Sequence, residues 1–155
     1  MNDDLDGYDR RILIALQADG RLTNQELAER VALSPSQCSR RRRRLEEAGV
    51  IRGYHAVVDR RLAGFGLISI VSVTLASHDP ESAARLKRLL DELPEVLEAH
   101  STTGEMDYTI KVVSRDLDAL SAFISTTLLP HEAVQNVKTA IVLDTLKESF
   151  ELPLG

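Results

Sequence analysis

Apolar residues recur at helical spacing near the start of the chain. Tyr8, Ile12 and Leu16 lie four residues apart with Leu13 beside them, so one face of a helix over residues 6–20 would be apolar. Two carboxylates, Asp6 and Asp9, make its first turn acidic, which suits the positive end of a helix. The pattern predicts an amphipathic helix that packs within a small domain.

Two further helices begin at capping boxes, in which a Ser or Thr and a Glu or Gln three residues later satisfy each other's backbone N–H groups. The boxes are Thr23–Glu26 and Ser34–Gln37, and Pro35 takes the favoured first helical position. The second helix runs to about Ala48, where Gly49 ends it. Two short helices joined by a three- or four-residue turn are typical of a helix-turn-helix over residues 23–48. The alternative is a helical hairpin with no role in DNA binding.

Five consecutive arginines, Arg40–Arg44, lie inside the second helix of this pair. They would cover every face of the helix and repel one another unless phosphates neutralise them, so they favour DNA binding. In the helix over residues 36–48, the side chains expected to reach base edges are Ser36, Gln37, Ser39, Arg40 and Arg43. Those expected at phosphates are Arg41 and Arg44, together with the helix N-terminus at Ser34.

The core-facing stripe of this helix is expected to comprise Cys38, Leu45 and Ala48. Arg42 falls on the same stripe, four residues after Cys38. Either its stem packs while its guanidinium reaches outward, or the helix is rotated so that the roles of residues 40–44 shift by one position. Cys38 also has two interpretations, a core-filling thiol and a redox sensor.

The net charge of −5 is unexpected for a DNA-binding protein, but the charge is unevenly distributed. Residues 1–61 contain 12 Lys and Arg against 10 Asp and Glu, whereas residues 62–155 contain 7 against 14. Because phosphate contacts are screened beyond about 10 Å, local clustering of charge matters more than the total. The charge therefore permits DNA binding by the first part of the chain.

Composition argues against several classes of protein. No apolar run approaches the roughly 20 residues of a membrane span, and the acidic N-terminus lacks the apolar core of an export signal. A single cysteine cannot form an internal disulfide, which fits the cytoplasm. The four histidines have no metal-ligand spacing, and no nucleophile with an adjacent base or phosphate-binding glycine loop is evident. We therefore expect no metal, no cofactor and no enzyme activity.

The second half of the chain alternates between strand and helix patterns. The β-rich segment Val50–Val58 predicts a strand that leaves the first domain, and two glycines in Arg60–Gly66 predict a hinge. The strands expected next are Leu67–Leu75, Val96–Thr103, Met106–Val113 and Val134–Leu143, and the helices are Pro80–Leu93 and Leu117–Leu129. The order βαββαβ is ferredoxin-like, and with the helical first part it makes the fold class α+β.

Polar residues gather around Gly104, between the second and third of these strands. Glu105 and Asp107 follow the glycine, and Ser101 and Thr103 precede it. A plain interpretation is a β-hairpin, because Gly and acidic residues suit its turn and Thr suits strands. The other interpretation is a ligand site, in which exposed backbone N–H groups near Gly104 bind a carboxylate.

Several short motifs stand in a characteristic order along nearly the whole chain. They are Leu5-Asp6, Asp9, Ile12-Leu13, Leu16-Gln17, Leu33-Ser34-Pro35-Ser36, Cys38, Arg43-Arg44-Leu45-Glu46, Gly49-Val50-Ile51, Gly53-Tyr54, Gly104, Asp107-Tyr108, Val142-Leu143, Lys147 and Leu152-Pro153-Leu154. In this order and spacing the chain resembles the leucine-responsive/asparagine-responsive (Lrp/AsnC) family of bacterial transcription regulators. Arg42 departs from the family's pattern, which usually has an apolar or small residue there.

The resemblance implies two domains: a winged-helix-like DNA-binding domain over residues 1–60 and a ferredoxin-like effector-binding and oligomerisation domain over residues 61–155. It implies a homodimer that can assemble further into an octamer. It also implies an amino-acid effector bound by the Gly104 loop and the last strand, where Asp107 or Glu105 would pair with the effector's ammonium group. The effector-site residues expected are Ser101, Thr103, Gly104, Glu105, Asp107, Thr139 and Ile141.

The function expected is therefore that of a regulator that binds an imperfect palindrome in double-stranded DNA and responds to an amino acid or related metabolite. An alternative is an amino-acid-sensing regulatory module of metabolism that binds no DNA. A third class, RNA binding by the ferredoxin-like sheet, is disfavoured because Tyr108 is the only aromatic residue on its predicted strands.

Overall fold

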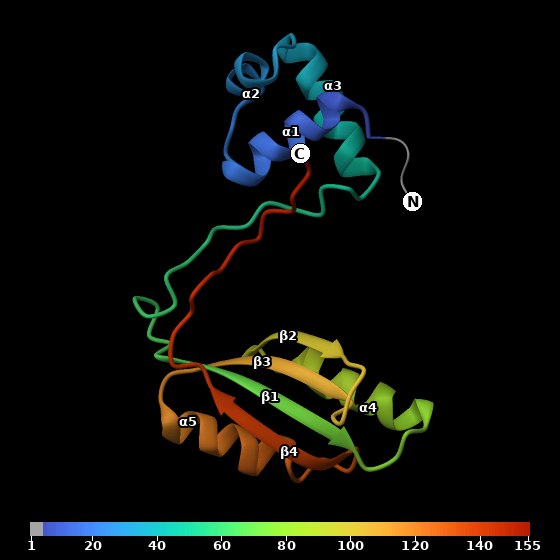
Figure 1. Cartoon of the computed structure of the whole chain (residues 1–155), viewed down its shortest axis with the longest axis vertical. Coiled ribbons are helices and arrows are strands. Elements are labelled where there is room, and N and C mark those ends of the chain that lie inside the picture. The colour runs from blue at the N-terminus through green and yellow to red at the C-terminus, as the bar shows by residue number, and fades with distance from the viewer. Residues whose placement is uncertain (1–4) are drawn as a thin grey trace. The chain divides into compact units, whose positions relative to one another are not determined.

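The computed structural model describes residues 5–155 and divides the chain into two compact units (Figure 1). One unit comprises the chain up to Val57 together with Lys147–Gly155, and the other comprises Val58–Leu146. The division expected from sequence lies at residue 60 and leaves the C-terminal tail with the second domain. In the structure the Gln17 side chain donates to the Leu152 carbonyl and accepts from the Leu152 N–H, at 3.1 and 2.7 Å. The tail therefore packs on the helical unit.

The helical unit contains α1 (Gly7–Ala18), α2 (Asn24–Val31) and α3 (Pro35–Glu47). Both predicted capping boxes are present, and a third, formed by Asp6 and Asp9, begins α1. Gly49 has φ of +71°, the left-handed conformation that ends a helix and that glycine adopts without strain. The buried apolar core of the unit is Ile12, Leu13, Leu16, Leu22, Leu27, Ala28, Val31, Cys38 and Leu45.

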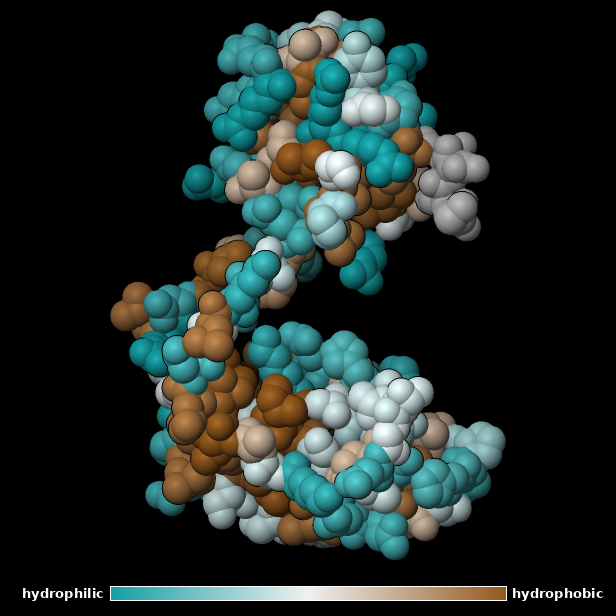
Figure 2. Space-filling view, in the orientation of Figure 1, coloured by the Kyte–Doolittle hydropathy of each residue, from teal (hydrophilic) through white to brown (hydrophobic). Residues whose placement is uncertain are grey.

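The predicted strand over Val50–Val58 is absent from the structure, and this part of the prediction is wrong. The segment is non-helical and unpaired, and Val57 and Val58 expose 83% and 68% of their surface. A strand requires backbone hydrogen bonds to a neighbour, and no described strand pairs with this segment. The β-branched residues of this segment favour a strand, but the segment has no neighbouring strand in the described chain with which to form the backbone hydrogen bonds of a sheet. Apolar side chains are visibly exposed along this connecting segment (Figure 2).

The second unit is a four-stranded antiparallel sheet with the strand order β2-β3-β1-β4. Its strands are β1 (Leu67–Leu75), β2 (Val96–Ser101), β3 (Tyr108–Ser114) and β4 (Val134–Ile141). Helix α4 (Pro80–Glu92) connects β1 to β2, and α5 (Leu117–Ala122) connects β3 to β4 (Figure 1). This arrangement confirms the predicted βαββαβ ferredoxin-like domain.

One face of the sheet packs against the helices. Val71 and Val73 of β1 are fully buried beneath Leu86 of α4 and Leu128, which follows α5. The helix predicted over Leu117–Leu129 changes at Phe123 into a π-helix, η1 (Phe123–Leu128). Within η1, the hydroxyls of Ser125 and Thr126 donate to backbone carbonyls four residues earlier, at 2.8 and 2.7 Å. No helix of the described chain is long and apolar enough to cross a membrane.

Asp79 caps the N-terminus of α4 and gives this helix a pH-dependent stability. Hydrogen bonds from the Ser77 side chain and from Ser82 hold the pKa of Asp79 far below its ordinary value. Because the pKa is depressed in the folded state, the stabilisation is complete above the unfolded pKa of about 3.9 and is lost as the pH falls through the folded pKa. We expect Asp79→Ala to lower the melting temperature at neutral pH, and the difference from wild type to shrink in acid below about pH 4. Asp79→Asn, which caps without titrating, should retain most of the stability in thermal melts at neutral pH.

Candidate DNA-binding face and effector site

The helix-turn-helix is formed by α2 and α3, and Ala32 in the turn adopts the left-handed conformation with φ of 58°. Along α3, Ser36, Arg40 and Arg43 recur every three or four residues and so share one face of the helix. All three are exposed, and Ser39 beside them is half-buried. Arg40 and Arg43 make no hydrogen bond or ion pair within the described residues 5–155. Two free guanidinium groups and two hydroxyls thus occupy one open face of α3.

Arg41 and Arg44 are bound to the carboxylates of α1. The Arg41 guanidinium donates to Asp6 and to Asp9 at 2.7 and 2.8 Å, and Arg44 donates to the other oxygen of Asp9. The Asp9 side chain is fully buried. The backbone N–H of Asp9 and the Arg41 guanidinium hold the pKa of Asp6 below its ordinary value, and the same carboxylates raise the pKa of Arg41. These two arginines, expected at phosphates, are therefore already paired within the protein.

Arg42 does occupy the inward side of α3, but its guanidinium is also bound within the protein. It donates to the Leu22 carbonyl at 3.0 Å, to Glu46 at 3.2 Å and to the hydroxyl of Tyr54 at 2.9 Å. Its guanidinium carbon lies 4.6 Å from the centre of the Tyr54 ring, a cation–π distance. The Arg42 side chain is 22% exposed. Sequence spacing does not reveal Tyr54 and the Leu22 carbonyl as its partners.

The remaining residues of α3 divide between core and cap. Cys38 and Leu45 are buried as expected, whereas Ala48 is exposed, so its assignment to the core stripe is wrong. Ala48 is the C-cap of α3, beyond the last turn that contacts the other helices. Ser34 and Gln37 satisfy each other in the capping box, with the Ser34 N–H donating to the Gln37 amide oxygen at 3.0 Å.

The Cys38 thiol is positioned as a core side chain. It is fully buried, and burial raises its pKa above the ordinary thiol value, although Arg41 acts in the opposite direction. Because the thiolate is the reactive form, a raised pKa disfavours oxidation. This favours the core-filling interpretation over the redox sensor.

In the second unit, the loop between β2 and β3 places Asp107 at the centre of a polar cluster. The Leu75 N–H donates to one Asp107 carboxylate oxygen at 2.8 Å, and the other lies 3.0 Å from His78 Nε2. The loop is closed by Thr102, whose hydroxyl donates to the Met106 carbonyl at 2.8 Å. The sequence pattern does not place His78 at this site, because only the fold brings the end of β1 next to this loop.

The structure does not bring all the expected effector residues together within one chain. Ser101, Thr103, Gly104 and Glu105 are exposed in and beside the loop, with Glu105 3.8 Å from Lys138. Thr139 and Ile141 lie on β4, where they pair with Val71 and Ser69 of β1. Since β4 and β2 are opposite edges of the sheet, these two residues are separated from Ser101 by two intervening strands.

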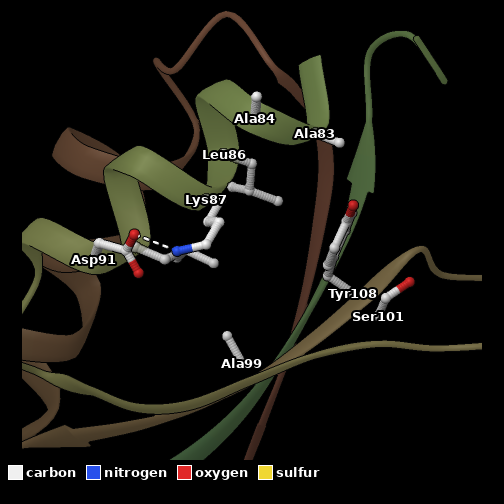
Figure 3. Close-up of a pocket in the computed structure, with 9 residues that line it drawn as sticks. Ala83, Ala84, Leu86, Lys87, Asp91, Ala99, Ser101 and Tyr108 are labelled. Atoms are coloured by element: carbon white, nitrogen blue, oxygen red, sulfur yellow. Dashed lines mark hydrogen bonds and ion pairs between the residues drawn. The ribbon is translucent and has the colours of Figure 1, made fainter. Parts of the chain in front are cut away.

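A hollow of about 460 Å³ lies between α4 and the strands β2 and β3 (Figure 3). Small side chains on both walls leave this space: Ala83 and Ala84 on the helix, and Ala99 and Ser101 on β2. Tyr108 borders it, and the Lys87–Asp91 ion pair lies along the helix wall. A second hollow of about 280 Å³ shares Ala83, Ser101 and Tyr108 and extends the space to His78 and Asp107. The two together connect an apolar region with a polar one.

A helix-turn-helix followed by a ferredoxin-like domain defines a two-part regulator with a DNA-binding and a ligand-binding domain. Residues 5–52 match the winged helix-turn-helix DNA-binding family, and residues 68–152 match the Lrp/AsnC ligand binding domain. The leucine-responsive regulatory protein of Escherichia coli is 37% identical over 149 residues, which are 96% of this chain and 91% of that protein. The chain belongs to the Lrp/AsnC family of transcription regulators.

Solved structures of related regulators match nearly the whole chain. The transcriptional regulator NMB0573 of Neisseria meningitidis, in complex with L-Met, is 40% identical with a TM-score of 0.93, and the match covers 97% of both chains. An AsnC family transcriptional regulator of Agrobacterium tumefaciens is 36% identical with a TM-score of 0.90, covering 96% of this chain and 97% of that one. The resemblance seen in the sequence motifs is therefore confirmed by fold.

Proposed function

We propose that this chain regulates transcription by inserting α3 into the major groove of double-stranded DNA. The observation that carries this proposal is the open face of α3, where Arg40 and Arg43 stand free beside Ser36 and Ser39. An arginine on this face can neutralise a phosphate or bind guanine with two hydrogen bonds, and the serine hydroxyls can donate or accept at either base or phosphate. The Gln37 side-chain NH₂ group, which the capping box leaves available, adds a donor at the same end of the helix.

We propose a homodimer as the DNA-binding unit, reading an imperfect palindrome with two copies of α3 about 34–36 Å, or a multiple of this, apart. Exposed apolar side chains support a second copy of the chain as partner. Leu62, Leu143 and Leu146 expose 90% or more of their surface, and Val57 exposes 83%. Isolated exposed leucines are common, but a set this exposed along the connecting segments suits an interface. Assembly of dimers into an octamer follows the family's pattern.

We propose that an amino acid binds in the second unit at the polar cluster around Asp107 and its adjoining hollow, and acts as effector. The complex of the 40% identical regulator with L-Met supports this class of ligand. The free amino acid needs a carboxylate or equivalent acceptor for its ammonium group, and Asp107 offers one at the edge of the hollow. Thr139 and Ile141 join this site only if a second chain contributes them. We propose no catalytic step, and we expect the protein to act in the cytoplasm.

The DNA proposal is tested by titrating the full-length protein onto a duplex from the upstream region of its own gene and onto a scrambled duplex, over a series of salt concentrations. A regulator binds the native duplex more tightly at moderate salt, where non-specific phosphate attraction is weakened. Equal affinity for both duplexes at every salt concentration would contradict the proposal. Effector-dependent stability without such DNA binding would instead identify an amino-acid-sensing module of metabolism.

The effector proposal gives a prediction for Asp107. A thermal-shift screen over the amino acids should reveal a ligand that raises the melting temperature, because it binds only the folded state. Asp107→Ala should weaken that ligand by about 10-fold or more, since a charge-assisted hydrogen bond is lost. Glu105→Ala tests the other carboxylate that the sequence offers, and we expect it to leave the response unchanged, because Glu105 is 90% exposed and lies outside both hollows. A full response in the Asp107 variant would exclude this carboxylate as the ammonium partner.

A further inference from the structure

We propose that two carboxylates of the α1 N-terminus, Asp9 and Asp6, bind Arg41 and Arg44 and so keep them from DNA. Arg40 and Arg43 then supply the phosphate-neutralising charge of α3. The inference rests on the proposed DNA-binding function and specifies which cations perform it. Asp9 is thereby a positioning residue, since it acts on DNA only through the arginines that it holds.

Asp9 is a buried carboxylate at the start of α1. Its side chain has no exposed surface, and its two oxygens are bound by Arg41 and by Arg44, while the Asp6 N–H donates to the second oxygen at 3.2 Å. A buried carboxylate is stable only when paired and hydrogen-bonded, so releasing either arginine to a phosphate would remove the charged partner of one buried Asp9 oxygen. The pairing therefore opposes a transfer of these arginines to DNA.

The charges of the two carboxylates and of the two arginines that they bind cancel. Asp6 and Asp9 carry two negative charges, and Arg41 and Arg44 carry two positive charges, so this cluster is neutral overall. Arg42 is likewise matched by Glu46, at 3.2 Å. Of the five arginines, Arg40 and Arg43 are the two that have no ion-pair partner among residues 5–155, and both lie on the exposed side of α3. The sequence contains five consecutive arginines, but in the folded helix two of them, Arg40 and Arg43, are available to DNA.

The arginines also point to different sides of α3. Successive residues of an α-helix are about 100° apart, which places Arg41 on the side of α3 that faces Asp6 and Asp9. Its side chain is 20% exposed. Arg44 lies at the border of the open face and is 54% exposed, yet its guanidinium is still turned to Asp9. Arg44 is therefore the stricter test of the proposal.

The test measures how the binding constant for the native duplex falls with salt. Each phosphate neutralised contributes about 0.9 to the slope of log K against log salt concentration. We expect Arg40→Gln and Arg43→Gln each to reduce the slope by about 0.9. Arg41→Gln and Arg44→Gln should leave the slope unchanged, even where affinity falls equally at all salt concentrations. A reduction of about 0.9 in either of the latter variants would overturn the inference.

A second pair of variants tests the carboxylates directly. Asp9→Asn should steepen the salt dependence by about 1 to 2 and reduce the preference for the native duplex, because non-specific phosphate attraction increases. Should Asp9→Asn fail to fold, Asp6→Asn decides, since Asp6 is half-exposed and, of the described arginines, pairs with Arg41. It should steepen the slope by up to about 1, and an unchanged slope would contradict the proposal. If the wild-type protein itself binds the native and the scrambled duplex equally, the proposed DNA-binding function is refuted instead.

Discussion

Arg43→Glu is expected to weaken binding to the native duplex by about 100-fold or more. A charge-assisted hydrogen bond from arginine to a phosphate contributes about 1.5–3 kcal/mol, and a carboxylate in its place adds repulsion from the phosphates. Because each 1.4 kcal/mol is a factor of ten in affinity, the two effects together reach this range. Arg43 is suited to the role because it is exposed on the same face of α3 as Ser36 and Arg40.

The matched control is Arg88→Glu, which changes the net charge of the protein by the same amount on an exposed residue of α4, in the other unit. Its affinity for the duplex should stay within about twofold of wild type, since Arg88 is not part of the face of α3 that we propose for DNA binding. Fluorescence anisotropy with a labelled duplex gives both values. Equal losses in the two variants would show that net charge, and not the face of α3, governs binding.

Ile12→Ala is expected to destabilise the helical unit by about 3 kcal/mol. Ile12 is fully buried at the centre of α1, and removing its side chain loses transfer free energy and leaves a cavity among close-packed neighbours. Because α1 holds α3 in place, DNA binding should decline in parallel as the unit loosens. Urea unfolding followed by circular dichroism at 222 nm measures the change.

Ile14→Ala is the matched control, because Ile14 lies two residues from Ile12 on the same helix but is 44% exposed. It should cost less than about 1 kcal/mol, since most of its surface remains in water in the folded state. A similar loss of stability in both variants would mean that helix propensity, and not core packing, dominates at these positions.

The elements that the sequence predicted well are those decided by neighbouring residues. The starts of α2 and α3 are fixed by Thr23–Glu26 and Ser34–Gln37, since capping hydrogen bonds join residues three apart. The strand β1 is predicted with its full bounds because a run of β-branched residues extends over Leu67–Leu75. The ferredoxin-like order followed from these local patterns, and it is the order found.

The elements that sequence could not decide depend on distant partners. The segment over residues 50–58 has strand composition but no strand to pair with, and residues 147–155 return to the helical unit through Gln17. Within the effector site, His78 approaches Asp107 only because β1 and the loop after β2 meet in the sheet. Such contacts depend on packing between elements, which periodicity along the chain does not encode.

The five arginines of α3 show most clearly the difference between what neighbouring residues decide and what distant partners decide. The sequence by itself determined that α3 is a helix, where it begins, and that five arginines lie in it. Only the tertiary structure decided which of them are free: Asp9 of α1 binds Arg41 and Arg44, and Tyr54 binds Arg42. The physical reason is that helix formation follows from local hydrogen bonds, whereas the availability of a charge depends on which opposite charge the fold places beside it.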